Sequence, residues 1–586
     1  MKFLGNVLAT IVGLFLFCIF FFFGIMLIGA LFGGSSDMAV VESNSVIELN
    51  LDGINNDYGG KYKDPWVTLF SETESIGVTD IINAISAAKS DDNIKGISLL
   101  NTSSFLGLAQ SKEVRDALED FKTSGKFVVA YSENFIQNDY YLSSVADTVY
   151  LNPVGQMDFK GLSSEVLFFK DFQDKSGLKM EVIRHGKYKS AVEPFLQNSM
   201  SESNREQISS LLNSVWGSVT GDISKSRKVS PSALDSIANG LLARTPEMAK
   251  SAGLIDKIAY EDQYHDGIRK ALKIDKKDDY ATVDIRDYAS NVAKMPPIVG
   301  GSDRIAVIYA QGMILGGEGD VGYIGEQSIK RALKEARDDK KIKAVVLRID
   351  SPGGSALVSD LIWREIELTK KSKPVVASMG NTAASGGYYI ACNANEIFAE
   401  ENTITGSIGV FGTLPNFTQF TNKMGIRAEQ VNTHENSAGY SVFLPLDDKF
   451  RAVTQESVEH IYNVFVNRVA TGRKMTFAEV DAIAQGRVWT GSEAVKNGLV
   501  DKIGGLDAAL KSAAKLAKID KYRVVNFPEY EKKFGEMFGM MPFAMSRESL
   551  IKQEIGEENY RLLEQIRRLN SLKGIQAILP YELRIN

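Results

Sequence analysis

The feature that most constrains this chain is an internal repeat, in which two halves of about 240 residues follow one plan. DDNIKGISLLNTSS (residues 91–104) resembles DKKIKAVVLRIDSP (339–352), so Ile94 corresponds to Ile342 at an offset of 248. TPEMAKSAGLIDKI matches TGSEAVKNGLVDKI at an offset of 245, which aligns Thr245 with Thr490. Similar segments recur in the same order at four places, so we interpret the chain as a tandem duplication.

Each half alternates short β-branched runs with amphipathic stretches. IKAVVLRID and PVVASM are typical of buried strands, whereas GEQSIKRALKEARDD and VSDLIWREIELTKKS have helical spacing. This alternation predicts an α/β fold with parallel strands, whose ligands bind in the loops after the strands. DSPGGSA (350–356) and GNTAASGG (380–387) follow apolar strands directly.

The length of 586 residues is too great for one hydrophobic core. We predict an N-terminal membrane anchor at 1–36, a first α/β repeat at 40–295, a second at 302–526, and a partly helical tail at 527–586. The tail is Met-rich and then charged, and it is interpreted as a peripheral helix, a membrane contact or a flap beside the substrate.

The N-terminus contains 26 residues without a charge, from Val7 to Phe32. As a helix they would extend about 39 Å, more than the ~30 Å hydrocarbon core of a bilayer. Lys2 before this segment and Asp37 and Glu42 after it favour an N-terminus inside and a catalytic part outside the cytoplasm. The net charge of -6 gives no sign of nucleic-acid binding, and two cysteines are too few for a thiolate metal site.

Ser385 lies among small residues that let a substrate backbone approach its hydroxyl, although a serine here is also typical of a helix cap. Aligning the paired tyrosines places Gln137 opposite Ser385, and the first half lacks the glycines. Conversely, GKYKSAVEPF in the first half places Lys189 opposite Ser437. Each half therefore carries a reactive residue that the other lacks, and we predict one site assembled from both.

The base that would serve Ser385 is not a recognisable triad histidine. A buried lysine loses its proton more readily because desolvation disfavours the ammonium form, so Lys189 can act as the base. His185, four residues earlier, is an alternative base, and Lys187 is close enough that spacing alone does not separate it from Lys189. The backbone N–H groups of Gly354 and Gly386 are suited to an oxyanion hole.

KSAVEPF, DSPGG, NTAASGGYY and TGSIGV together resemble the signal peptide peptidase A family of the long, tandem-repeat type, also called bacterial protease IV. The resemblance covers the anchor and both halves. It implies a fold similar to the crotonase and Clp-protease superfamily, a serine protease with a Ser/Lys dyad of Ser385 and Lys189, and an oxyanion hole at Gly354 and Gly386. It also implies that Ser407 orients the lysine.

The same resemblance implies a homotetramer in the bacterial inner membrane that degrades cleaved signal peptides on the extracytoplasmic side. The expected chemistry needs neither a metal nor another cofactor. Two alternatives remain open at this point: a crotonase-like enzyme acting on acyl thioesters, and a scaffold without catalytic activity in membrane quality control.

Overall fold

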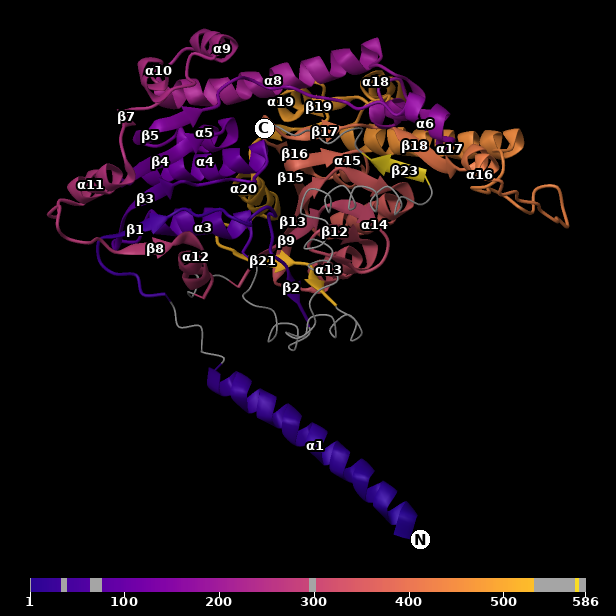
Figure 1. Cartoon of the computed structure of the whole chain (residues 1–586), viewed down its shortest axis with the longest axis horizontal. Helices are drawn as coiled ribbons and strands as arrows, with labels where there is room; N and C mark the ends of the chain where they lie inside the picture. The colour runs from indigo at the N-terminus through magenta and orange to yellow at the C-terminus, as the bar shows by residue number, and fades with distance from the viewer. Residues whose placement is uncertain (1, 33–38, 64–75, 295–301, 532–574, 579–586) are drawn as a thin grey trace.

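The computed structural model describes residues 2–32, 39–63, 76–294, 302–531 and 575–578. Two α/β units lie side by side in this part of the chain, the first in indigo to magenta and the second in rose to yellow (Figure 1). The mixed α/β architecture and the tandem repeat predicted from the sequence are both present. The helix predicted within EENYRLLEQIRRLN of the tail lies outside the described residues.

The first unit is built on a six-stranded sheet of order β7-β5-β4-β3-β1-β8 in which all neighbours are parallel. Its strands are β1 (Ser45–Glu48), β3 (Ile94–Leu100), β4 (Phe127–Phe135), β5 (Thr148–Met157), β7 (Lys257–Ile258) and β8 (Thr282–Asp284). Its helices are α3 (Val78–Ala88), α4 (Leu108–Lys122), α5 (Gln137–Ser143), α6 (Lys170–Ser176), α7 (Glu193–Leu196), α8 (Glu202–Arg227), α9 (Pro231–Gly240), α10 (Pro246–Ser251), α11 (Glu261–Leu272) and α12 (Ile285–Lys294).

The second unit repeats this order as β20-β16-β15-β13-β9-β21, with β17 and β19 added beside β15. Its strands are β9 (Arg304–Gln311), β13 (Ile342–Ser351), β15 (Val375–Ala384), β16 (Glu396–Ala399), β17 (Ile404–Gly406), β19 (Val488–Thr490), β20 (Lys502–Ile503) and β21 (Arg523–Phe527). Its helices are α13 (Glu326–Asp338), α14 (Ala356–Lys370), α15 (Gly386–Ala391), α16 (Thr418–Lys423), α17 (Asp448–Arg473), α18 (Phe477–Ile483), α19 (Gly491–Lys496) and α20 (Leu506–Ala517).

Burial explains why these residues form these elements. In β13, Val345, Val346 and Leu347 are at most 1% exposed, because helices cover both faces of a parallel sheet. In α13, Ile329 and Leu333 are four residues apart, which places both on one buried face of the helix.

A third sheet joins the two units, with the order β11-β12-β10-β14-β23-β18-β6. Its strands are β6 (Lys179–His185), β10 (Met313–Leu315), β11 (Gly319–Asp320), β12 (Tyr323–Gly325), β14 (Gly353–Ser355), β18 (Val410–Asn416) and β23 (Ile575–Ile578). Strand β6 belongs to the first repeat but pairs antiparallel with β18 along its whole length. A smaller pair, β2 (Lys61–Tyr62) with β22 (Glu529–Tyr530), also joins the two repeats.

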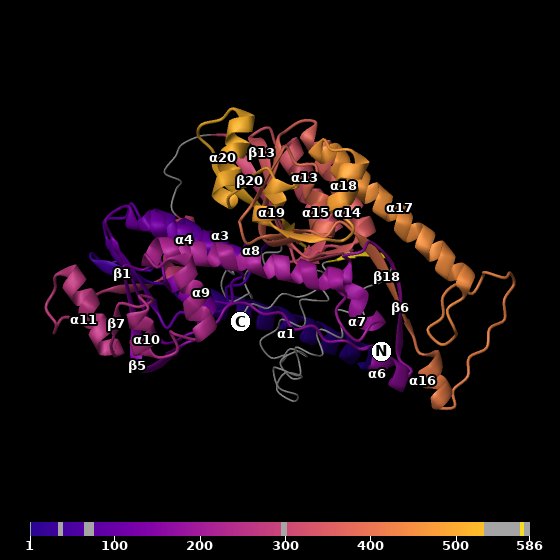
Figure 2. The same ribbon diagram turned by 90° about the horizontal axis from the view of Figure 1, so that it is seen from above.

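Two further features bind the repeats together. Helix α8 runs from the first unit across the second (Figures 1 and 2). In addition, the buried guanidinium of Arg348 forms ion pairs of 2.6 Å with both Asp57 and Glu113 of the first repeat. The pKa of the Arg348 guanidinium is raised by these carboxylates, although burial opposes them.

Helix α1 (Lys2–Phe32) is drawn apart from this body in Figure 1. Among the residues that the structure describes, no helix meets the length and hydropathy required for crossing a membrane, so the anchor stays a prediction.

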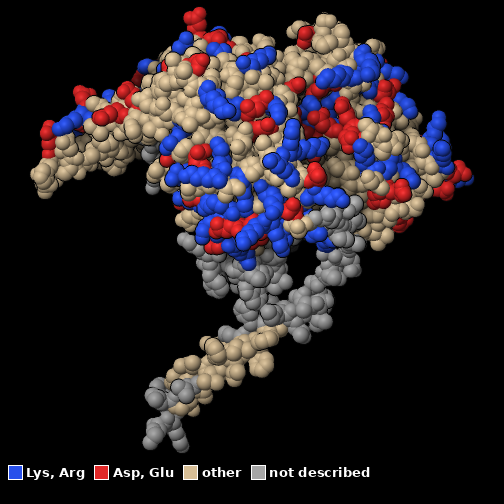
Figure 3. Space-filling model, turned by 180° about the vertical axis from the view of Figure 1, so that it is seen from behind, with Lys and Arg blue, Asp and Glu red and all other residues tan. Residues whose placement is uncertain are grey.

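On the face drawn in Figure 3, Lys and Arg are intermingled with Asp and Glu.

Candidate active site

Ser385 occupies the turn between strand β15 and helix α15. Its backbone has φ 56° and ψ -114°, a conformation that residues with a Cβ rarely adopt. Its side chain makes no capping hydrogen bond to α15, and the residue is fully buried. Ser385 therefore stands at the N-cap position of α15, as the helix-cap interpretation had it, but its side chain does not cap the helix, and the strained turn aims the hydroxyl elsewhere.

The amine of Lys189 points at this hydroxyl. Lys189 follows β6 in the first repeat, and its Nζ lies 2.9 Å from Ser385 Oγ, 2.9 Å from Ser407 Oγ and 3.1 Å from the Ser407 carbonyl oxygen. The structure thus brings together Ser385, Lys189 and Ser407 although they are up to 218 residues apart.

Burial sets the charge of the lysine. Lys189 is 0% exposed, and desolvation lowers the pKa of its amine well below the ordinary value. Within the described part of the chain no carboxylate contributes to this shift, whereas an acidic neighbour would raise the pKa again. A neutral amine in hydrogen-bond contact with a hydroxyl is what general-base catalysis needs.

Glycines make room for the lysine loop. A Cβ on Gly486 would lie 2.6 Å from the backbone nitrogen of Lys189, and one on Gly409 would lie 3.1 Å from Lys189 Cδ. The loop is also pinned because the Tyr188 N–H donates to the Gln485 carbonyl at 2.8 Å. Sequence reasoning missed these glycines, since their positions against the lysine become visible only when the two repeats are docked.

Ser407 is held by backbone contacts on both sides. Its own N–H donates to the Arg487 carbonyl at 2.6 Å, and its φ is 50°. The neighbouring Gly406 carbonyl accepts from the Ser385 N–H at 2.8 Å. The two hydroxyls that flank the lysine amine are therefore fixed relative to each other by the main chain.

The glycines of SPGG and of SGG meet beside Ser385. Gly353 has φ +99° and Gly354 has φ +155°, and a Cβ on Gly353 would lie 2.7 Å from the Gly386 nitrogen. A Cβ on Gly387 would lie 2.6 Å from the Ser351 carbonyl oxygen, so this glycine is also sterically required. The segments that carry Gly354 and Gly386, the two residues predicted to supply oxyanion amides, are thus in direct contact.

The other candidate bases lie elsewhere. The His185 ring stacks on Tyr462 with centroids 3.9 Å apart, and none of its described contacts reaches Ser385. Lys187 is exposed, with its amine 5.0 Å from the centre of the Tyr188 ring. Geometry therefore separates Lys189 from both alternatives.

The first repeat uses the counterpart of Ser385 structurally. Gln137 begins α5, and its side-chain oxygen accepts from the N–H groups of Lys160 at 3.1 Å and Gly161 at 2.9 Å. Its amide nitrogen donates to the Gly161 carbonyl at 3.0 Å. Gln137 therefore supports a loop through these hydrogen bonds, and its side-chain amide is not a nucleophile.

A buried carboxyl supports the strand before Ser385. Asp350 accepts from the Thr382 N–H at 2.9 Å and from the Asn381 side-chain amide at 3.2 Å. Burial, followed by repulsion from Asp57, raises the pKa of Asp350 to about 7. Asp350 does not contact Ser385, so its effect on the site passes through β15. Sequence reasoning did not assign it a role.

Comparison with known proteins gives consistent results. Residues 120–275 and 367–520 each match peptidase family S49, once in each repeat. The chain is 36% identical to "Protease 4" of Haemophilus influenzae, over 88% of this chain and 86% of that protein. It is 38% identical to "Protease 4" of Salmonella typhi over 76% and 73%, and 34% identical to "Serine protease SPPA, chloroplastic" of Arabidopsis thaliana over 75% and 65%.

Proposed function

The chain belongs to peptidase family S49 and is a serine protease, and on that premise we propose that Ser385 is its nucleophile and Lys189 its general base. The observation that carries this proposal is the 2.9 Å contact between the Lys189 amine and the Ser385 hydroxyl, inside a fully buried site. Family membership favours peptide hydrolysis over the acyl-thioester and scaffold alternatives.

The first half of the reaction forms an acyl-enzyme. The neutral amine of Lys189 removes the proton from Ser385 Oγ as the oxygen attacks the peptide carbonyl carbon. The N–H groups of Gly354 and Gly386 stabilise the negative charge that develops on the carbonyl oxygen. The protonated lysine then gives its proton to the leaving amine, and the peptide C–N bond breaks.

The second half releases the product. Lys189, neutral again, takes a proton from water, which attacks the ester carbon and regenerates the Ser385 hydroxyl. Ser407 supports both halves through its 2.9 Å contact with the lysine amine, which keeps the amine directed at the reacting oxygen. No step requires a metal or another cofactor.

The substrates we propose are hydrophobic peptides, in particular cleaved signal peptides, at the surface of the bacterial inner membrane. The uncharged segment Val7–Phe32 supports a single-pass anchor with the N-terminus inside and the catalytic part outside the cytoplasm. An anchored enzyme meets apolar peptides where they concentrate.

Carbonate extraction of membranes tests the anchor: the full chain should stay in the pellet, whereas a chain beginning at residue 40 should not.

We also propose that the chain forms a closed homo-oligomer, and the internal repeat supports this. Three serines of α8 contact the second repeat, each at 2.7 Å, in the pairs Ser210–Glu493, Ser214–Thr490 and Ser218–Glu401. Helix α17 is the counterpart of α8 and has the same length, 26 residues. Helix α17 belongs to the second repeat, so a further copy of the first repeat is what it would need to make equivalent contacts.

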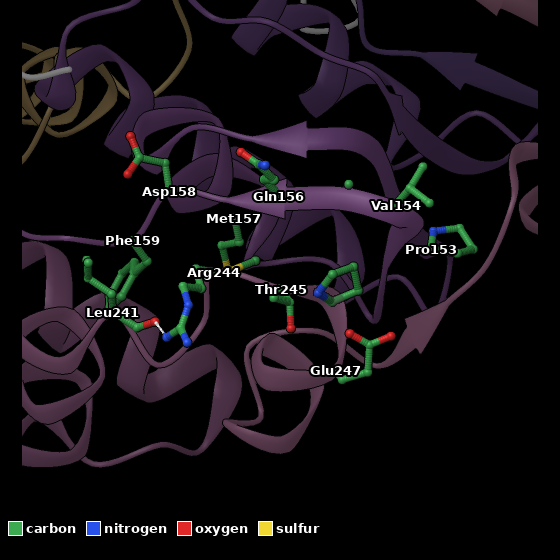
Figure 4. A pocket seen from close by; sticks show the side chains of 12 residues that line it. Pro153, Val154, Gln156, Met157, Asp158, Phe159, Leu241, Arg244, Thr245 and Glu247 are labelled. Atoms are coloured by element: carbon green, nitrogen blue, oxygen red, sulfur yellow. Dashed lines mark hydrogen bonds between the residues drawn. The ribbon is translucent and has the colours of Figure 1, made fainter.

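The surface that would receive α17 is open. The repeat offsets place Thr245 at the position of Thr490 and Pro153 at that of Glu401, and both line a cavity of about 680 Å³ in the first repeat (Figure 4). Val453 on α17 is 55% exposed. The cavity thus occupies the position in the first repeat that α8 contacts in the second repeat, so it is placed to receive α17 of another copy.

The two paired strands that join the repeats, β6 and β18, each have a corresponding segment in the other repeat. Strand β6 corresponds to residues 427–433 and β18 to residues 162–168, and neither segment forms a strand within the described chain. Val431 and Leu167 in these segments are 101% and 64% exposed. We infer that residues 427–433 of one copy pair with 162–168 of the next, a head-to-tail contact that closes into a ring. The family resemblance favours four copies.

The oligomer is tested by native mass spectrometry in detergent. Thr245→Trp should fill the cavity and convert the tetramer to monomer, whereas Ser236→Trp, on the exposed face of α9, should leave it intact. A Thr245→Trp protein that remains fully tetrameric would contradict this interface.

The enzymatic proposal is tested with a serine-directed phosphonate. Incubation with the detergent-solubilised protein should abolish cleavage of a quenched hydrophobic signal peptide, and peptide mapping should place the adduct on Ser385. An adduct on another serine that coincides with loss of activity would overturn the assignment.

A further inference from the structure

A cavity of about 240 Å³ lies in the first repeat at the position that corresponds to the catalytic site of the second. The offset of 248 residues places Leu106 opposite Gly354 and Asn138 opposite Gly386, the two residues to which we assign the oxyanion hole. Leu106 and Asn138 both line the cavity, and the Asn138 amide nitrogen donates to the Leu106 carbonyl at 3.1 Å. Where the second repeat has the catalytic glycines, the first repeat therefore has side chains that line a cavity.

The second repeat supplies part of the wall of this cavity. Its contribution comes from β15, from β17 and from the turn before β17, in the residues Asn381, Thr382, Asn402 and Ile404. A Cβ on Gly107 of the first repeat would collide with the Asn381 side chain, so the repeats are in direct contact here. The cavity is thus built by the docking of the two repeats.

Two side-chain carboxamides in the cavity have unpaired atoms. Asn402 is 4% exposed, and neither its amide nitrogen nor its amide oxygen forms a hydrogen bond within the described part of the chain. The side-chain oxygen of Asn138 is likewise buried and has no partner among the described residues. Native structures rarely leave such atoms unpaired, because burial costs them their hydrogen bonds to water. One donor group and two acceptors therefore point to a ligand in this cavity.

The chemistry of the lining indicates the class of ligand. A peptide group offers one C=O acceptor and one N–H donor, which complement the amide nitrogen and oxygen of Asn402. Phe105, Leu108 and Val215 supply apolar contacts, and none of the described residues that line the cavity is charged. Sites for drug-sized ligands have volumes of about 300–1,000 Å³, so this smaller cavity suits one or two residues of a chain. An uncharged, apolar stretch of peptide meets these conditions.

Two paired strands connect the cavity to the catalytic site. Thr382 of β15 pairs with Ile404 of β17, and both residues line the cavity. Ser385 and Ser407 follow them along the chain by three positions each. Three strand residues extend about 10 Å, so an apolar peptide of moderate length is long enough to occupy both places.

We propose that this cavity is a second peptide-binding site, which holds an uncharged apolar segment of the substrate while Ser385 acts on another segment. The proposal rests on the function proposed above for the identity of the peptide, and it gives the first repeat a role in substrate binding besides supplying Lys189. The Asn402 carboxamide pairs with one peptide group of the bound segment. The Asn138 oxygen accepts from a further N–H, and the apolar lining contacts the side chains of the segment.

Photo-crosslinking with an uncharged peptide tests this proposal. The probe is an oligoleucine peptide, acetylated and amidated at its ends, in which one leucine carries a diazirine. The full chain in detergent is first treated with a serine-directed phosphonate to block Ser385, and the crosslinked residues are mapped by mass spectrometry. Adducts should form on residues 105–109 and 402–404. Adducts confined to segments that do not line the cavity would overturn the proposal.

Asn402→Leu keeps the approximate size of the side chain but removes both hydrogen-bonding groups, so the yield of cavity adducts should fall about tenfold. Because these atoms are unpaired in the described structure, the variant should melt no earlier than the wild type. Asn526→Leu is the matched control, since the Asn526 side-chain oxygen is also buried and unpaired there but does not line the cavity, and its yield should equal that of the wild type. Equal yields from Asn402→Leu and the wild type would contradict the proposed recognition.

A modified probe separates recognition of peptide groups from uptake of apolar material. An oligoleucine probe with N-methylated peptide groups keeps the apolar side chains but lacks the N–H donors, so its yield of cavity adducts should also fall about tenfold. An undiminished yield would mean that the cavity takes up apolar molecules in general, detergent and lipid included, and would overturn the proposal.

Cleavage of a quenched hydrophobic peptide by unblocked samples reports on the proposed function separately. A wild type that cleaves this peptide but gives no cavity adducts overturns the second site and leaves the proposed function standing. A wild type that gives cavity adducts without cleavage overturns the proposed function and leaves the peptide-binding cavity standing.

Discussion

A Cβ on Gly486 would lie 2.6 Å from the backbone nitrogen and 2.7 Å from the Cα of Lys189, so the absence of a side chain at Gly486 allows the lysine loop of one repeat to enter the site of the other. The residue also has φ +83°, which favours glycine. The proposed catalytic geometry therefore depends on a glycine that is not itself one of the proposed catalytic residues.

Gly486→Ala should displace Lys189 and reduce kcat by about 10²-fold, because a misplacement of about 1 Å costs that much in catalysis. Gly425→Ala is the matched control, since Gly425 has a similar φ of +79° but open space around its Cβ position. Peptide-cleavage kinetics and thermal melts of both variants decide this. Equal losses of activity in the two would show that backbone strain alone is responsible.

Lys189→Met should stabilise the folded protein at pH 7 by about 0.5–2 kcal/mol while abolishing activity, as is common for residues selected for function. The pKa of Lys189 is lowered in the folded state, so between that pKa and the unfolded value of about 10.4 the unfolded chain binds one more proton. Wild-type stability therefore rises with pH across this window.

The measurement is the difference in urea unfolding free energy between Lys189→Met and wild type from pH 6 to pH 10. We expect the difference to shrink as the pH rises. Lys187→Met, at an exposed position, should show little difference at any pH. A Lys189→Met advantage that grows with pH would mean that the lysine is charged in the folded protein.

Ser385→Gly should be more stable than Ser385→Ala by about 1 kcal/mol, although both should be inactive. Ser385 has φ 56°, which costs a residue with a Cβ about 1–3 kcal/mol but costs glycine little. At Ser236, within helix α9, the order should reverse because glycine is the poorer helix former. Thermal melts that rank alanine above glycine at both positions would show that the backbone at Ser385 is not strained.

Arg348→Met should destabilise the protein by about 3–5 kcal/mol, since it leaves Asp57 and Glu113 buried without their partner. Arg304→Met breaks only the 3.7 Å pair with Asp339, whose side chains are about one third exposed, and should cost about 0–1 kcal/mol. Chemical unfolding measures both. Similar small losses would mean that the Arg348 cluster does not couple the repeats.

Much of the fold follows from sequence pattern, because the β-branched runs and helical periodicities of the two halves repeat in register. The pairing of Lys189 with Ser385 was predictable for a related reason: a duplication exposes which copy has kept or acquired a reactive side chain. At the position that corresponds to Ser385, the first repeat has Gln137, whose side chain supports a loop.

Other features depend on contacts between segments far apart in the chain and leave no local signal. Strand β6 pairs with β18 across 225 or more residues, and no periodicity in KMEVIRH selects that partner. Gly486, Gly409 and Gly353 are needed because of what lies opposite them. The tail, interpreted as a helix, a membrane contact or a flap, contributes β23 through backbone pairing, which is tolerant of sequence and therefore hard to predict.

The most direct test of the account is cleavage of a hydrophobic signal peptide by Ser385→Ala, Lys189→Ala and Lys187→Ala beside the wild type, with folding verified by circular dichroism. We predict that kcat falls by about 10³-fold or more for Ser385→Ala and Lys189→Ala, as for other nucleophile and base deletions, and stays within about twofold for Lys187→Ala. A folded Lys189→Ala protein with near-normal turnover would contradict the Ser/Lys mechanism.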